Sequence, residues 1–121
     1  MKRITGLIAV AVCALALAAW TAAAPSRSNA VTLTGAVGPS FTISLKKGSG
    51  RVATLKRGKY AFVIRDRSAE HNFHLRGPVS RTFTGVSFMG TKTITVTLKP
   101  GRYTYVCDPH ADEMRGSFRV T

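Results

Sequence analysis

The residues best suited to chemistry lie close together near the end of the chain. The segment reads Cys107-Asp108-Pro109-His110-Ala111-Asp112-Glu113-Met114. A thiolate, an imidazole and a thioether are the soft and borderline ligands that suit copper as it cycles between Cu(I) and Cu(II). The segment therefore predicts a loop that can supply three ligands, from Cys107, His110 and Met114, to one copper ion.

A trigonal copper site of this kind needs a second imidazole, and an earlier segment offers two candidates. Side chains alternate between the two faces of a strand, so in the expected strand 71–76 His71 points inward with Phe73 and Leu75. The outer face carries Asn72, His74 and Arg76. The alternation favours His71 as the ligand and His74 as a solvated surface residue.

The elements that must position these ligands are short strands. From residue 31 onward, alternating runs are separated by Gly, Pro and basic turns, and no stretch has a helical period. Strands are expected at 31–35, 41–45, 51–55, 60–65, 71–76, 91–98, 103–107 and 116–121. The clearest is 91–98, where Ile94, Val96 and Leu98 face one way and the threonines and Lys92 the other. Residues 77–90 are expected to form a long connection.

An internal repeat supports this arrangement. Residues 54–64 align with residues 97–107, and each copy reads as strand, glycine turn and a strand that begins with Tyr. The expected inward residues Tyr60, Phe62 and Ile64 correspond to Tyr103, Tyr105 and Cys107. The repeat therefore places the thiol at an interior-facing strand end. About eight short antiparallel strands predict an all-β, Greek-key sandwich or barrel.

The N-terminal residues 1–23 are predicted to be a secretory signal peptide. Two basic residues follow the initial Met, residues 4–19 are uncharged and mostly apolar, and small residues precede Pro25. Cleavage is favoured after Ala23, with Ala30 as a second candidate. Export to the periplasm, cell envelope or extracellular space is expected.

With cleavage after Ala23, residues 24–30 are expected to form a short linker and residues 31–121 the functional domain. An uncleaved N-terminal anchor is the alternative, because residues 4–24 are just long enough to span a bilayer. After cleavage Cys107 is the single remaining cysteine, in a compartment where thiols are normally paired. A lone thiol there is an unpaired buried residue, an intermolecular bridge or a metal ligand.

The length and charge of the chain narrow the classes of partner. Its 121 residues suit one small domain, and 18 Lys+Arg against 5 Asp+Glu give a formal net charge of +13. Binding to nucleic acid is not expected, because the basic residues are dispersed, no aromatic RNA-binding motif is present and an exported protein rarely meets nucleic acid. An acidic envelope, anionic lipid headgroups or an acidic protein partner fit better. We expect a monomer.

Two segments, 71–75 and 103–116, resemble the small cupredoxins, the plastocyanin-, amicyanin- and azurin-like blue copper proteins. The resemblance extends over roughly residues 31–121. It implies a cupredoxin-like fold and one type 1 copper ion. The strong ligands implied are His71, Cys107 and His110, and the long axial ligand is Met114.

The resemblance also assigns roles to neighbouring residues. Asn72 matches the family asparagine whose side chain ties the early His strand to the Cys loop, and His74 has a counterpart that does not bind metal. Asp108 stands where Ser or Thr is common. Met114 as an ordinary core residue and His110 as an ordinary loop histidine are the alternatives to metal binding.

The function predicted from these features is one-electron transfer between unidentified redox partners, with acidic proteins as candidates. One thiolate, two imidazoles and a weak thioether hold copper in a geometry acceptable to both oxidation states. An enzyme is not expected, since the usual type 1 centre has no open ligand position and the chain has 3 His in all. The alternatives are a copper carrier or buffer and a metal-free or zinc-loaded basic β-sandwich that acts as a binding module.

If the family arrangement holds, the electron leaves through the exposed imidazole edge of His110. The surrounding apolar docking patch is then expected to comprise Pro109, Ala111, Gly38, Pro39 and residues 86–89.

Overall fold

The computed structural model describes residues 19–20 and 29–121 of the chain. The predicted signal peptide, residues 1–23, and the linker, residues 24–30, lie outside the described residues except at positions 19, 20, 29 and 30. Among the residues that are described, no helix has the length and apolar character needed to cross a membrane.

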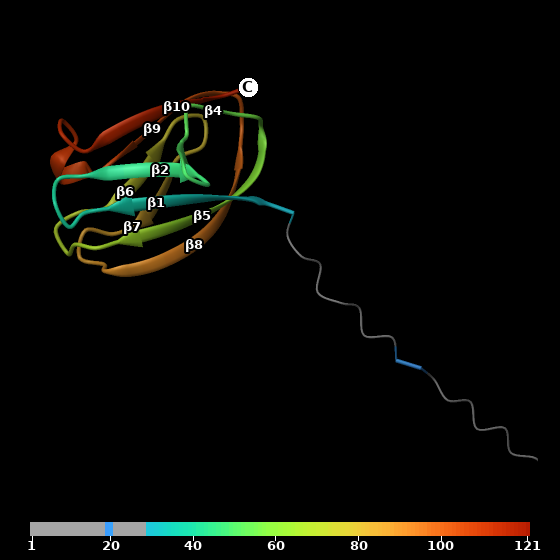
Figure 1. Cartoon of the computed structure of the whole chain (residues 1–121), viewed down its shortest axis with the longest axis horizontal. Coiled ribbons are helices and arrows are strands. Elements are labelled where there is room, and N and C mark those ends of the chain that lie inside the picture. Colours follow the sequence, from blue (N-terminus) through green and yellow to red (C-terminus); the bar gives the residue numbers. More distant parts are fainter. Residues whose placement is uncertain (1–18, 21–28) are drawn as a thin grey trace, which may run out of the picture.

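The described part of the chain folds into two five-stranded sheets that face each other (Figure 1). Its elements are β1 (Val31–Val37), β2 (Ile43–Lys47), β3 (Gly50–Arg51), β4 (Thr54–Leu55), β5 (Gly58–Asp66), β6 (Phe73–Arg76), β7 (Arg81–Thr84), β8 (Gly90–Leu98), β9 (Gly101–Val106), the 3-10 helix η1 (Asp108–His110) and β10 (Arg115–Val120). The first sheet has the order β3-β2-β1-β5-β8 and the second β4-β10-β9-β6-β7. The expected all-β sandwich is confirmed.

The sheets are mixed, so the expectation of a purely antiparallel domain was wrong. β1 pairs with β5 in parallel, and β4 pairs with β10 in parallel, while the other pairings are antiparallel. In each parallel pair the chain crosses to the other sheet between the two strands before it returns to the sheet that it left. A two-residue hairpin cannot make such a return.

In the part of the chain that the structure describes, ten strands replace the roughly eight that were expected, for two reasons. The expected strand 51–55 is divided, because β3 belongs to the first sheet and β4 to the second. The expected connection 77–90 contains β7, where Phe83 is buried and stacks on Phe62 at 4.8 Å between ring centroids. A single buried aromatic between polar residues leaves too short a pattern to be read as a strand.

The core between the sheets follows the alternation of the strands. In β8, Val96 and Leu98 are buried and Ile94 packs against the core, whereas the threonines and Lys92 are exposed, as predicted. Aromatic rings fill much of the interior and include stacked pairs between Phe73 and Tyr105 and between Tyr103 and Phe118. This packed interior is the rigid base on which the loops at either end are built.

The two copies of the sequence repeat form equivalent corners. Tyr60 donates a hydrogen bond to the carbonyl of Lys56 at 2.6 Å, and Tyr103 donates one to the carbonyl of Lys99 at 2.8 Å. Each tyrosine stands just after a glycine turn at which the chain changes sheets, from β4 to β5 and from β8 to β9. The repeat therefore encodes a sheet-to-sheet corner that is closed by a tyrosine hydroxyl.

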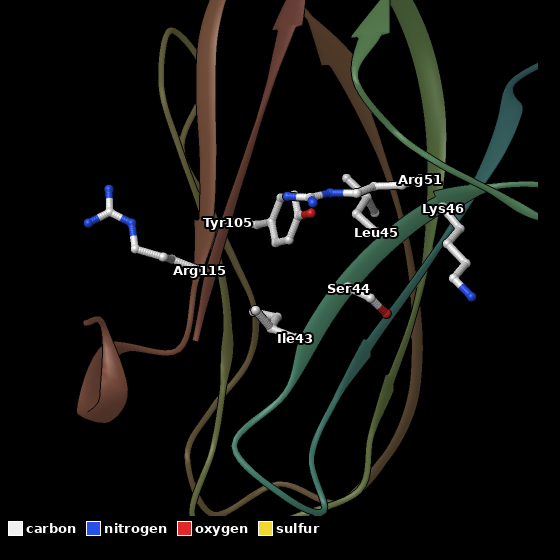
Figure 2. Close-up of a pocket in the computed structure, with 7 residues that line it drawn as sticks. All are labelled: Ile43, Ser44, Leu45, Lys46, Arg51, Tyr105 and Arg115. Atoms are coloured by element: carbon white, nitrogen blue, oxygen red, sulfur yellow. The ribbon is translucent and has the colours of Figure 1, made fainter. Parts of the chain in front are cut away.

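A hollow of about 260 Å³ opens along the side of the sandwich, where β2 faces β9 and β10. Figure 2 shows Tyr105 and Ile43 pointing into it, while Ser44, Lys46 and Arg115 point away. No histidine or cysteine lines this hollow. It is a gap between the sheets, separate from the loop end that carries the chemistry.

Candidate metal centre

Strand pairing brings the predicted ligands to one end of the sandwich. β6 and β9 are antiparallel neighbours, with His74 opposite Val106. His71 comes shortly before β6 and Cys107 directly after β9, so the two residues meet at the same edge of the second sheet. His110 ends η1 in the loop that follows Cys107. This loop lies at the opposite end of the molecule from the start of β1 (Figure 1).

Three donor atoms converge at this end. His71 Nδ1 and His110 Nδ1 lie 3.1 Å apart. Cys107 Sγ lies 3.7 Å from His71 Nδ1 and 3.6 Å from His110 Nδ1. Among the residues described, these three form the cluster of histidine, cysteine and carboxylate groups suited to holding a metal ion.

The size of this triangle fits a bound metal. A point at equal distance from the three donor atoms would lie about 2.0 Å from each of them. Metal–nitrogen and metal–sulfur bonds are typically about 2.0 to 2.3 Å long. One sulfur and two imidazole nitrogens are also the donors of trigonal blue copper sites. The residues present therefore fit a copper ion in donor type and in spacing.

Burial differs among the cluster residues. Cys107 is fully buried and His71 is 2% exposed, whereas His110 is only partly buried. Water is therefore kept from the thiol and from one imidazole. Of the three cluster residues, His110 is the one that reaches the surface.

Backbone hydrogen bonds close the loop around the cluster. The Cys107 N–H donates to the carbonyl of Met114 at 3.0 Å, and the N–H groups of His110 and Met114 donate to the carbonyls of Cys107 and His110. Met114 is fully buried and packs in the same core cluster as Cys107. Its burial suits both the axial-ligand and the core interpretation of this residue.

Asn72 connects the two segments that carry the cluster. Its Oδ1 accepts a hydrogen bond from the Asp108 N–H at 2.7 Å, and its Nδ2 donates to Asp108 Oδ2 at 2.9 Å. Asn72 is only 4% exposed, and its side chain ties the segment at His71 to the Cys107 loop, as the resemblance implied. The Cys107–Met114 loop folds over it.

Asp108 is the centre of a small polar cluster that the sequence did not reveal. His74 Nδ1 lies 3.0 Å from its Oδ2, and Arg76 donates to its Oδ1. Burial raises the pKa of the Asp108 carboxyl, but hydrogen bonds from Asn72, His74 and Arg76 outweigh it and hold that pKa below its usual value of 3.8. The sequence did hold one sign of this polar cluster that the sequence analysis did not use: Asn72, His74 and Arg76 alternate along one face of the expected strand.

His74 does not join the metal-suited cluster. It lies on the outer face of β6, half-buried against Asp108 rather than fully solvated. The alternation that separated His71 from His74 therefore predicted their placement correctly.

Phe41 is a site residue that the sequence analysis missed. Its ring centroid lies 4.9 Å from that of His110 and 5.5 Å from that of His71, although the side chain is 57% exposed. The sequence analysis placed Phe41 at the start of a strand, 41–45, but β2 begins at Ile43 and Phe41 lies before it.

The docking patch expected around His110 needs one correction. Gly38 is buried beside His71, where an added Cβ would lie 3.2 Å from the imidazole Cδ2, and its φ of +71° also favours glycine. It therefore gives the backbone room to pass the ring instead of forming a surface. Pro39, Pro109, Val86 and Met89 are exposed as expected, and Ala111 is partly exposed.

Comparison with known proteins gives matches by structure only. No protein-family model and no curated protein sequence matches this chain. The solved structure of the copper protein rusticyanin matches with a TM-score of 0.52 and 19% identity over 78% of this chain and 80% of that one. Reduced rusticyanin matches with a TM-score of 0.50 and 24% identity, over 78% of this chain and 81% of that one.

A copper-containing nitrite reductase from Thermus scotoductus SA-01 also matches, with a TM-score of 0.52 and 19% identity. The likeness covers 83% of this chain but only 25% of the reductase chain. At these identities the likenesses show a shared fold. The chain thus has the cupredoxin fold, and the cluster of His71, Cys107 and His110 at one end of its sandwich fits a type 1 copper site.

Proposed function

We propose that this protein is an exported type 1 copper protein that carries single electrons between redox partners. The strong ligands would be His71, Cys107 and His110, and the weak axial ligand would be Met114. The observation that carries the proposal is the donor triangle, whose sides of 3.1, 3.6 and 3.7 Å fit one ion held by one sulfur and two imidazole nitrogens. Copper held there supplies a one-electron couple between Cu(II) and Cu(I).

The chain contributes rigidity to this chemistry. Cys107 and His71 are buried, the ligand loop is closed by backbone hydrogen bonds, and Asn72 fastens that loop to the chain beside His71. Donor atoms held in this way move little when the charge of the site changes. Little reorganisation is what rapid electron transfer requires.

His110 provides the route to the surface. Its ring is partly exposed and lies beside the exposed Phe41, with Pro39 and Pro109 also exposed at this end. We assign the exit of the electron to this imidazole edge and docking of the redox partner to the apolar surface around it. The thiol and His71 are buried, and we propose electron transfer rather than catalysis at this site.

Export is part of the proposal, with residues 1–23 as a signal peptide. The support is the pattern of a basic start, an apolar stretch and small residues before Pro25. Rusticyanin and the nitrite reductase from Thermus scotoductus SA-01 are copper proteins, which supports the choice of metal.

Spectroscopy of the copper-loaded protein tests the proposal. Addition of Cu(II) to the metal-free protein is expected to produce an intense blue band from thiolate-to-copper charge transfer, and Cys107→Ser is expected to abolish it. The His74→Gln variant is the matched control and should keep the band, because His74 lies outside the donor triangle. Bound Cu(II) without the band in the unmodified protein would contradict the proposal.

The copper-carrier alternative makes a different kinetic prediction. A carrier releases Cu(I) readily to a chelator and exchanges electrons slowly with small redox partners. The proposed electron carrier retains copper during many cycles of oxidation and reduction. Stopped-flow electron exchange and chelator competition on the same sample distinguish the two functions.

A further inference from the structure

Charge is distributed very unevenly between the two ends of the sandwich. All five acidic residues of the chain belong to two segments at the end that carries the metal-suited cluster: Asp66 ends β5 and Glu70 follows it, and Asp108, Asp112 and Glu113 follow β9. The turns at the other end hold only basic charged side chains. The basic pole, as we name it, consists of Lys47, Lys56, Arg57, Lys59, Lys99, Arg102 and Arg119.

Strand register places these seven cations together. Lys59 stands opposite Thr97 across β5 and β8, and Arg102 stands opposite Arg119 across β9 and β10. The Arg57 N–H donates to the carbonyl of Thr121, which brings the turn between β4 and β5 against the last residue of the chain. The corner turns that follow β4 and β8 are therefore neighbours at one end of the molecule.

The cations of the basic pole are exposed and have no carboxylate side chain as partner. Each of the seven is exposed, and the ion pairs of the described residues involve only Asp108. The nine-residue β5 runs between the two ends and is about 30 Å long. That length exceeds the Debye length of about 8 Å at physiological salt, so the distant acids do not neutralise the pole.

The N-terminal segment enters the fold at this same end. Val31 begins β1 opposite Tyr60, near the start of β5, and the chain reaches it at the end of the sandwich away from η1 (Figure 1). A hollow of about 600 Å³ lies here, lined by Val31, Lys47 and Lys56 among others. The basic pole therefore surrounds the point at which the chain enters the fold.

We propose that the basic pole is a docking surface for an anionic phospholipid membrane. The lipid phosphates complement seven exposed cations that have no carboxylate side chain as partner, and clusters of Lys and Arg bind anionic lipid surfaces by this attraction. Binding through this pole directs the His71, Cys107 and His110 cluster away from the bilayer, toward soluble partners. The inference does not depend on copper and can fail or succeed independently of the proposed function.

Vesicle binding by residues 24–121 tests the inference. Both sheets and the whole core, from Leu33 to Val120, lie within this part of the chain, so it carries its own fold. The domain is expected to co-sediment with vesicles of equal amounts of phosphatidylglycerol and phosphatidylcholine but not with phosphatidylcholine alone. Binding should weaken as salt is raised.

A pair of charge-matched variants localises the surface. The variant Lys56→Gln/Arg57→Gln/Lys59→Gln removes three cations from the basic pole. The control Arg65→Gln/Arg67→Gln/Lys92→Gln removes three exposed cations from the other end of β5 and β8. Each basic residue near an anionic surface changes the partition coefficient about fivefold, so the first variant should bind roughly a hundredfold more weakly. The control should stay within several-fold of the unmodified domain.

Acetylation of the lysines while the domain is bound to vesicles reports which end of the molecule faces the membrane. Lys47, Lys56, Lys59 and Lys99 are expected to become protected, while Lys92, at the other end, remains reactive. Equal loss of binding in both triple variants, or equal protection of all these lysines, would overturn the inference in favour of undirected attraction by net charge. Failure to bind the mixed vesicles together with binding to polyglutamate would overturn it in favour of an acidic protein partner.

Discussion

At the scale of single residues, the candidate site depends on side chains that hold two distant segments together. His71 and Cys107 are far apart in the sequence, yet their donor atoms lie 3.7 Å apart. Asn72 maintains that proximity, because its amide both accepts from the Asp108 N–H and donates to the Asp108 carboxylate. Buried hydrogen-bonding groups are costly to leave without partners. Asn72 is therefore as important to the geometry as the donors themselves.

Replacement of Asn72 tests this role in the metal-free protein. Asn72→Ala should lower the free energy of unfolding by roughly 2 to 3 kcal/mol, because it removes two hydrogen bonds and leaves the Asp108 N–H unpaired. The measurement is urea denaturation followed by circular dichroism. The control Arg76→Gln alters only a half-exposed ion pair with Asp108 and should cost less than about 1 kcal/mol. Equal costs for the two variants would contradict the role given to Asn72.

At the scale of elements, the repeated corners explain how the chain passes between the two sheets. Tyr60 and Tyr103 stand after equivalent glycine turns, and each hydroxyl donates to the carbonyl four residues earlier. The second corner has an additional bond, since the Lys99 N–H donates to the Tyr103 hydroxyl at 3.0 Å. The second corner also leads directly into β9, the strand that ends at Cys107.

The extra bond predicts unequal costs for equivalent substitutions. Tyr60→Phe should lower the free energy of unfolding by about 1 kcal/mol and Tyr103→Phe by about 2 kcal/mol, since one and two hydrogen bonds are lost. Denaturant unfolding of both variants under the same conditions measures the difference. Each variant serves as the control of the other, because the change is the same in size and lies in matching parts of the repeat. A larger cost at Tyr60 would refute this account of the corners.

At the scale of the whole molecule, the cluster joins two connecting segments that lie far apart in the sequence. His71 lies between β5 and β6, while Cys107 and His110 follow β9. A metal bound to all three exists only in the folded state, so its binding free energy adds to the stability of the whole domain. Metal binding and folding are therefore coupled in this protein.

Thermal unfolding with and without copper measures this coupling. At a free copper concentration about 100 times Kd, the free energy of unfolding should rise by about 2.7 kcal/mol. His110→Gln should lose most of that increase, and His74→Gln, which leaves the donor triangle intact, should keep it. A stabilisation that is equally large in both variants would place the bound copper elsewhere.

The fold and the ligand loop were largely predictable because their signals are local. Alternation in residues 91–98 identified β8 and its buried face, and alternation around residue 71 separated inward His71 from outward His74. The short spacing from Cys107 to Met114 kept the candidate donors on one loop. These patterns depend on the two-residue period of a strand and on the short distance along the chain between the donors. Both can be read from neighbouring residues alone.

What the tertiary structure alone decided is which distant residues meet. The register of β6 against β9 brings His71 within reach of Cys107, and the turn before β2 lays Phe41 against both histidines. The convergence of the outer face of β6 on Asp108, and the confinement of the acids to one end, likewise follow from strand order. Contacts across sheets depend on pairing and packing throughout the core, and no local sequence pattern records them.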